Sequence, residues 1–150
     1  MAGIIRRQPA PWHLWLIGIL ALLWNGYGAF DFSMTLTRGA DYLRDANMSE
    51  AMVQYFHALP GWLYAPWGLG VWGGVLGAIC LLLRERWAVW AFALSLAGAV
   101  GSNIVSTLLY PPPAVAAPQG AMAILPYAII AIAAGLWVYA WRMARKSVLV

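Results

Sequence analysis

The chain has 150 residues, of which 63% are hydrophobic and 9% are charged, and its mean hydropathy is +0.72. Typical soluble domains contain about 25% charged residues, so the composition excludes an ordinary soluble protein and favours one membrane domain over residues 1–150. The formal net charge of +4 comes from basic residues beside apolar segments, which is typical of topology signals and attraction to anionic lipids and does not predict nucleic-acid binding.

Four apolar segments are long enough to cross roughly 30 Å of hydrocarbon as helices of about 20 residues. They cover residues 12–36, 61–83, 87–110 and 121–141. The first has a basic lead-in and contains Gly26 and Gly28, as a cleavable secretory signal does, but its apolar run continues to Phe32, beyond a typical signal core. We therefore expect an all-α membrane protein, a four-transmembrane-helix bundle that keeps its first span.

The two connections on the outer side differ in character. Between the first two spans, Ser49 is a suitable N-cap with Glu50 in the first turn, and Pro60 ends the segment. Apolar residues recur between them at helical spacing: Met52, Val53, Phe56 and Leu59. This pattern predicts a short amphipathic helix lying on the outer membrane surface. The prolines of residues 111–118 predict an extended, stiff linker before the fourth span.

Basic residues indicate the orientation of the spans. Seven of the nine fall on one predicted side: Arg6, Arg7, Arg84, Arg86, Arg142, Arg145 and Lys146. Basic flanks stay in the cytoplasm, so we expect a multi-pass protein of the bacterial inner (plasma) membrane with both termini cytoplasmic. Tryptophans at the same boundary form an interfacial belt that supports this topology: Trp12, Trp15, Trp87, Trp90, Trp137 and Trp141.

The second span is rich in glycine at spacings that allow close helix packing. Gly70 with Gly74, and Gly73 with Gly77, form two pairs of small residues four apart. Such pairs let the backbone of another helix approach closely. We expect these glycines to serve packing, either within the bundle or between protomers.

A second group of residues, polar or aromatic, is expected near the outer ends of the spans. At 1.5 Å per residue, Asp31 lies about 8 Å and Asn103 about 10 Å below the outer ends of their spans. Candidate members of an outward-facing pocket are Asp31, Asn103, Asn25, Tyr64, Trp67 and Tyr127. A carboxylate inside a membrane often marks a site, and this set would suit a sugar, another polyol or a cation. Alternatively, Asp31 is interfacial because the span ends near Phe30, and Asn103 only bonds across helices.

Other chemistry is not indicated by the sequence. Cys80 is the single cysteine, which excludes an intramolecular disulfide and a cysteine-based metal site. His13 and His57 are expected at opposite boundaries, about 30 Å apart, too far to ligate one haem within one protomer. No nucleophilic triad, carboxylate pair or phosphate-binding loop is present. We therefore expect no enzyme activity, no cofactor and no metal.

Several segments resemble a group of small bacterial four-span proteins, some of which are labelled sugar transporters. The resemblance lies in residues 22–26 (LLWNG), 60–62 (PGW), 67–73 (WGLGVWG) and 81–88 (LLLRERWA), together with Asp31, Met34, Thr35, Glu50 and Phe56. It covers residues 14–105 well and the last span loosely. It implies an inner-membrane four-helix protein without catalytic residues, and it draws attention to Asn25, Asp31 and Trp67.

Two functions are open at this point. The first is an interaction or accessory role, in self-association or in a larger membrane complex. The alternative is transport of a small polar solute such as a sugar or cation. Four helices are few for an alternating-access pathway, and the charge bias of seven inside against two outside disfavours antiparallel insertion. Transport would therefore require a parallel oligomer.

Overall fold

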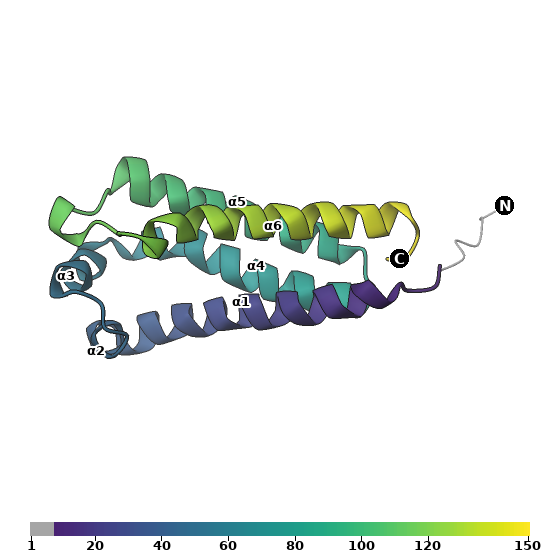
Figure 1. The fold of residues 1–150 in the computed structure, drawn as a ribbon, viewed down its shortest axis with the longest axis horizontal. Coiled ribbons are helices and arrows are strands. Elements are labelled where there is room, and N and C mark those ends of the chain that lie inside the picture. The colour runs from purple at the N-terminus through teal and green to yellow at the C-terminus, as the bar shows by residue number, and fades with distance from the viewer. Residues whose placement is uncertain (1–7) are drawn as a thin grey trace.

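The chain is described here by a computed structural model covering residues 8–150, so the predicted inner flank Arg6–Arg7 lies outside the described residues. Residues 8–150 form helices and their connections, with no strand (Figure 1). Four of the helices are long and apolar enough to cross a membrane. The all-α class is confirmed, and the four predicted segments correspond to four helices long and apolar enough to span a membrane.

The four long helices follow the predicted spans closely. They are α1 (Trp12–Arg38), α4 (Tyr64–Leu82), α5 (Trp87–Ile104) and α6 (Ala121–Arg145). A 3-10 turn, Gly61–Leu63, precedes α4, and a π-helical segment, Val105–Leu109, continues α5. The observed α1 and α6 extend two and four residues beyond the predicted ends at 36 and 141, because helical hydrogen bonding continues into polar residues that hydropathy assigns to the interface.

Helix packing is organised around α4, which contacts both α1 and α5, while α6 packs against α5. The glycines of α4 lie at these contacts: Gly70, Gly73 and Gly77 face α5, and Gly74 faces α1. At Gly73 a Cβ would lie only 3.1 Å from the backbone nitrogen of Ser95. The buried Ser95 hydroxyl in turn donates a 2.6 Å hydrogen bond to the Gly70 carbonyl. The predicted packing glycines are therefore used within the bundle.

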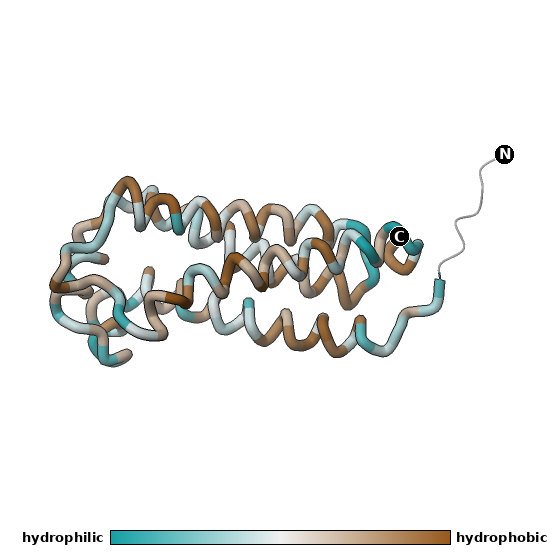
Figure 2. Tube along the Cα trace, turned by 45° about the horizontal axis from the view of Figure 1, so that its top comes forward, coloured by the Kyte–Doolittle hydropathy of each residue, from teal (hydrophilic) through white to brown (hydrophobic). Residues whose placement is uncertain are grey.

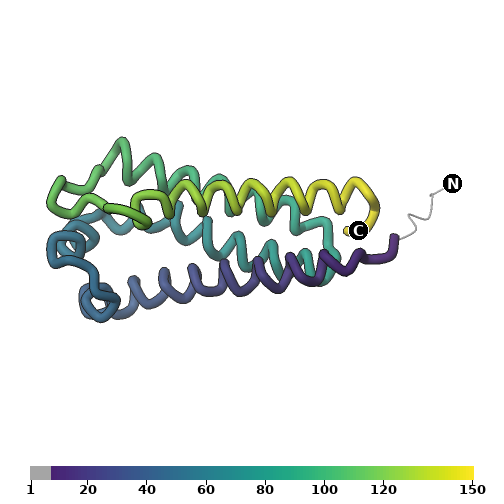
Figure 3. The backbone as a smooth tube through the Cα atoms, in the orientation of Figure 1, coloured from purple at the N-terminus to yellow at the C-terminus, as the bar shows by residue number. Residues whose placement is uncertain are grey.

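One end of the bundle, the terminal end, carries both described ends of the chain (Figures 1 and 3). The main core cluster lies there and combines all four long helices with residues that follow α6: Leu14, Ala21, Ala78, Leu81, Ala88, Phe92, Ala140, Met143, Val148 and Leu149. His13 Nδ1 lies 2.6 Å from the Tyr139 hydroxyl and joins α1 to α6. Backbone hydrogen bonds between residues 84–86 and Val150 fix the last residues against the connection between α4 and α5.

The opposite end carries the cap, defined as residues 39–60. It contains α2 (Ala40–Asp45) and α3 (Glu50–Ala58). The Ser49 hydroxyl caps α3 by accepting from the Met52 backbone N–H at 3.3 Å. Val53 of α3 is buried in protein, and the placement of this helix on a membrane surface stays a prediction.

The connection before α6 packs on the cap and departs from the extended linker predicted for residues 111–120. It contains a 3-10 turn, Ala114–Ala116, that contacts α3 and buries Ala116. The Tyr55 hydroxyl of α3 also donates a 2.6 Å hydrogen bond to the Tyr110 carbonyl. The prolines stiffen this segment, but contact with α3 turns part of it into a helix, which a proline count does not predict.

Polar residues gather at the two ends of the molecule, and apolar residues line the long helices between them (Figure 2). The described basic residues of the terminal end are Arg84, Arg86, Arg142, Arg145 and Lys146, with Glu85 as their acidic neighbour. Asp41, Asp45 and Glu50 lie in the cap with Arg44. This distribution is what a multi-pass membrane protein requires, because the middle of the bundle must face hydrocarbon.

Candidate functional site

The depth of Asp31 in the bundle follows from the contact between α1 and α4. Phe32, the next residue, lies against Gly68, where its ring would overlap an added Cβ. The Phe32 ring also meets the Trp67 ring edge-on, with centroids 5.1 Å apart. Asp31 is therefore level with the first turns of α4, where Tyr64 also lies. The tilted Tyr64 and Trp67 rings are 6.3 Å apart.

Asn103 lies at a similar depth on α5. Two residues earlier, Gly101 is close to Pro66 of α4, whose Cβ would be 3.5 Å from a Cβ added at Gly101. The antiparallel packing of α4 and α5 then places Asn103 level with the start of α4. Depth alone thus groups Asn103 with Asp31, but depth does not decide whether their side chains share a cavity.

The Asp31 carboxylate accepts a hydrogen bond from a residue of the cap. The Tyr42 hydroxyl of α2 donates a 2.7 Å hydrogen bond to Asp31 Oδ1. This hydrogen bond is the main reason that the pKa of Tyr42 rises from 10.0 to about 12, with burial and the Asp31 charge adding to it. Because α1 continues without a break to Arg38, Asp31 lies inside a helix, two turns before its end. The hydrogen bond from Tyr42 holds α2 against α1.

Asn25 has a packing role on the same helix. Its Nδ2 donates a 2.8 Å hydrogen bond to the Ala21 carbonyl one turn earlier. The amide group also lies against Gly74, where an added Cβ would overlap the Asn25 Oδ1 atom. Asn25 therefore fills the space that a glycine leaves on α4, and its amide nitrogen donates one hydrogen bond within α1.

Tyr127 lies on α6, on a different helix from the other candidates. It is 61% exposed on α6. Tyr127 and Asn25 are each twelve residues from the His13–Tyr139 contact along their helices, or about 18 Å at 1.5 Å per residue. Asp31 is eighteen residues, or about 27 Å, from the same contact. By this measure Tyr127 is level with Asn25, about 9 Å deeper than Asp31.

Two further candidates stabilise local structure. The Tyr64 hydroxyl donates a 2.8 Å hydrogen bond to the Phe56 carbonyl, which joins α4 to α3 of the cap. The Asn103 carbonyl accepts from Ser106 at 3.1 Å and from Thr107 at 2.7 Å, at the start of the π-helical segment. The Asn103 side chain has no hydrogen-bond partner among residues 8–150. A π-helical turn widens the backbone and often accompanies functional sites, but neither it nor the cap contacts were predicted from the sequence.

A cavity of about 210 Å³ lies where the cap meets the bundle. Its lining comes from the end of α1, from α2 and α3, and from the start of α4: Thr35, Leu36, Gly39, Ala40, Leu43, Val53, Phe56, His57, Leu59 and Tyr64. Tyr64 is the member of the predicted pocket that contributes to it. Apolar side chains dominate the lining, and the Tyr64 and Thr35 hydroxyls are already bonded to backbone carbonyls.

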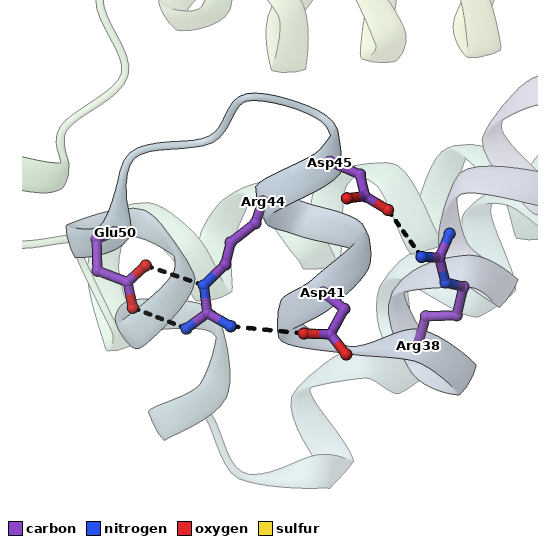
Figure 4. Close-up of polar contacts among 5 residues, drawn as sticks. All are labelled: Arg38, Asp41, Arg44, Asp45 and Glu50. Atoms are coloured by element: carbon purple, nitrogen blue, oxygen red, sulfur yellow. Dashed lines mark hydrogen bonds and ion pairs between the residues drawn. The ribbon is translucent and has the colours of Figure 1, made fainter.

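Ion pairs shape the exposed side of the cap (Figure 4). Arg44 lies 2.9 Å from Glu50 and 3.6 Å from Asp41, and Arg38 lies 2.7 Å from Asp45. The Arg44 guanidinium lowers the pKa of Glu50 by hydrogen bonding to it. All five side chains are exposed, so each pair adds little stability. Together they link α1, α2 and α3 and orient the cap.

The predicted site is thus distributed over separate contacts. Asp31, Tyr64 and Trp67 lie near one another in depth, and each has its own partner. The residue that sequence reasoning missed is Tyr42, which follows Asp31 by eleven positions in a polar connection. Its role depends on α2 turning back onto α1 after Gly39, whose φ of +54° is readily available to glycine. The one feature of the sequence that could have indicated this turn is Gly39, which follows the polar end of α1.

Comparison with known proteins adds no further identification: no family model, no curated protein and no solved structure matches this chain. Within residues 8–150, no group of three or more His, Cys, Asp or Glu side chains is arranged to hold a metal ion.

Proposed function

We propose that this chain is a multi-pass protein of the bacterial inner membrane with both termini in the cytoplasm, and that its non-catalytic role is assembly with other membrane helices. Membership of the small four-span proteins described above is part of the same proposal. The basic residues at the terminal end and the acidic residues in the cap support this orientation. In this orientation α3 lies at the outer membrane surface.

The observation that carries the proposal is that α6 packs against α5 but leaves most of its surface uncovered. In the most apolar 18-residue window of α6 only 6% of residues are buried, against 22%, 33% and 28% for the other three spans. Gly135, near the middle of α6, is exposed, and an added Cβ would meet no atom within 4 Å. Ala131, one turn earlier, is exposed as well. Ala131 and Gly135 are small residues four apart on an open face, which is the pattern that favours helix–helix association in lipid.

The glycines of α4 make this contrast informative. Gly70, Gly73, Gly74 and Gly77 are each covered by α1 or α5. Where this chain uses membrane glycines for packing, it places a helix against them. The same use at Gly135 requires a helix from another protomer or another protein. We favour a second copy of this chain, because self-association needs no further component.

The test is native mass spectrometry of the protein released from its own membrane by a mild detergent. We expect a homo-oligomer that Gly135→Leu reduces to monomer. Gly26→Leu is the matched control. An added Cβ at Gly26 in α1 also meets nothing within 4 Å, but the residues one turn to either side, Leu22 and Phe30, are large, so Gly26 lacks the small-residue pair. Co-purification with a different membrane protein, lost in Gly135→Leu, would identify an accessory subunit. A parent protein that is monomeric and without a partner would refute the assembly role.

Transport of a small polar solute is the second candidate, favoured by the similar depth of Asp31 and Asn103. It has less support, because Asp31 is paired with Tyr42 and the cavity near the cap is mainly apolar. If Asp31 serves a pathway, the purified parent should retain a small polar molecule in native mass spectra and Asp31→Asn should lose it without a change in assembly. Equal retention by both proteins would remove Asp31 from any pathway.

A further inference from the structure

The terminal end carries a second cavity, of about 450 Å³ and largely open to the surface, between the beginning of α1 and the end of α6. It is lined by Gln8, Pro9, Pro11, His13, Met143 and Lys146, and Val148 completes the lining. A cavity of this volume is within the range of small-molecule sites, and it combines a few polar groups with apolar walls. It plays no part in the assembly proposed above.

The walls of this cavity are held in place by hydrogen bonds. The Gln8 backbone N–H donates to the Ser147 carbonyl at 3.0 Å and so joins the segment before α1 to the segment after α6. The Arg84 guanidinium bonds to the carbonyls of Gln8 and Val148, the latter at 3.2 Å. Both lining segments are thus fixed to the connection between α4 and α5, which gives the cavity a defined shape.

The polar groups at the cavity favour an anion. Lys146 contributes an ammonium group, and His13 contributes an imidazole whose Nδ1 lies 2.6 Å from the Tyr139 hydroxyl. When that hydroxyl donates to Nδ1, neutral His13 carries its proton on Nε2, which then is a donor for a ligand. Among residues 8–150, this end of the molecule has five basic residues and one acidic residue, Glu85, so the surrounding field attracts negative charge.

The position of the cavity indicates which kind of anion it binds. It lies at the ends of two membrane-spanning helices, where Trp12, Trp15 and Trp141 are exposed. Exposed tryptophans at span ends mark the depth of lipid headgroups. We propose that this cavity binds the phosphate of an anionic phospholipid, with Lys146 and His13 as donors and with Met143 and Val148 against the glycerol backbone. The same phosphate chemistry is offered by free inorganic phosphate, which lacks the apolar part.

The test measures thermal unfolding of the full-length protein in a nonionic detergent, followed by its tryptophan fluorescence. Dioleoylphosphatidylglycerol, dioleoylphosphatidylcholine and inorganic phosphate are titrated separately. We expect phosphatidylglycerol to raise Tm by roughly 5 °C near saturation, because it binds the folded state alone, and the other two to have little effect. An equal effect of phosphatidylcholine would overturn the proposal. So would an equal effect of inorganic phosphate, which would assign the site to a soluble anion.

Two variants with the same change of charge locate the effect. Lys146→Gln should weaken the apparent affinity for phosphatidylglycerol about tenfold, as expected for the loss of one charge-assisted contact. Arg142→Gln is the matched control, because Arg142 lies one turn earlier on α6, is exposed and does not line the cavity. Equal weakening by both variants would show general attraction to the basic surface and would refute a site at this cavity. His13→Gln should weaken affinity in the same direction as Lys146→Gln.

Discussion

The Tyr42 hydroxyl donates a 2.7 Å hydrogen bond to the Asp31 carboxylate, which joins the cap to the membrane helix that precedes it. Asp31 is the carboxylate that the sequence singles out as a candidate for solute binding, and in the folded chain it has a structural partner. A carboxylate near hydrocarbon needs hydration, pairing or protonation, and here a phenol contributes to that requirement. The contact therefore explains why a charge is tolerated in α1 without assigning it a ligand.

Replacement of Tyr42 by Phe tests this contact. The variant should unfold at lower temperature, with a loss of about 1 kcal/mol, because one hydrogen bond to a partly exposed charged acceptor disappears. Thermal unfolding in detergent measures the change. Tyr127→Phe is the control, since the Tyr127 side chain is exposed and its hydroxyl has no hydrogen bond among the described residues. Equal losses in the two variants would show that the Tyr42 contact adds nothing.

The same pair predicts a pH dependence. The pKa of Tyr42 is about 12 in the folded protein, above its ordinary value of 10.0. A raised folded pKa means that the hydrogen bond contributes its full stability below pH 10 and loses it as the pH rises through 12. Tyrosinate absorbance is measured against pH in the parent and in Tyr42→Phe. The difference between the two curves reports Tyr42 and should show a titration near pH 12. In Asp31→Asn that tyrosine should titrate closer to pH 10, and an unchanged titration would contradict the assignment.

The contact of Asn25 with Gly74 predicts a strong asymmetry among glycine substitutions. Gly74→Ala should destabilise the bundle by about 1–3 kcal/mol, because the new Cβ overlaps the Asn25 amide. Gly26→Ala in α1, where an added Cβ meets nothing within 4 Å, should be close to neutral. Denaturant unfolding in detergent compares the two. In the double variant Asn25→Ala, Gly74→Ala, the loss should be smaller than the sum of the single losses. Additive losses would show that the two residues do not meet.

Ser95 tests the glycine contact between α4 and α5. Ser95→Ala removes the 2.6 Å hydrogen bond to the Gly70 carbonyl and should cost about 0.6–1.7 kcal/mol, the range for interhelical hydrogen bonds in membranes. Thermal unfolding measures the loss. Ser102→Ala on the same helix is the control, because the Ser102 hydroxyl has no hydrogen bond to a described side chain or carbonyl. If Ser102→Ala costs as much, the effect belongs to α5 as a whole.

Leu149 tests the contribution of the residues that follow α6. It is 1% exposed and belongs to the main core cluster, so Leu149→Ala should cost about 2–4 kcal/mol. Val115→Ala is the control, because Val115 is 82% exposed. Limited proteolysis should also cut Leu149→Ala faster near residues 146–150. Parent-like stability would show that this segment is detached in solution.

The candidate site shows where prediction from sequence stopped. Hydropathy and helical rise placed Asp31 and Asn103 at similar depths, and the contacts of Phe32 and Gly101 with α4 agree with that placement. The direction in which each side chain points around its helix could not be predicted, because it depends on which neighbouring element each helix face contacts. Asp31 meets Tyr42, and Asn25 meets Gly74. The Tyr127 side chain is exposed, and its hydroxyl has no hydrogen-bond partner among residues 8–150.

By itself, the sequence determined four helices long and apolar enough to span a membrane, the residue at which each begins, and the end of each to within four residues. It could do so because a bilayer imposes one requirement on every residue of a span, and that requirement is local and readable from composition. Only the tertiary structure decided that Tyr42 pairs with Asp31, that the α4 glycines are covered by α1 and α5 while Gly135 is open, and that the terminal end closes around Leu149. These are contacts between residues distant in the chain, which local sequence patterns do not report. Exposure to lipid and burial in protein both favour apolar side chains, so hydropathy cannot distinguish a lipid-facing surface from a buried one.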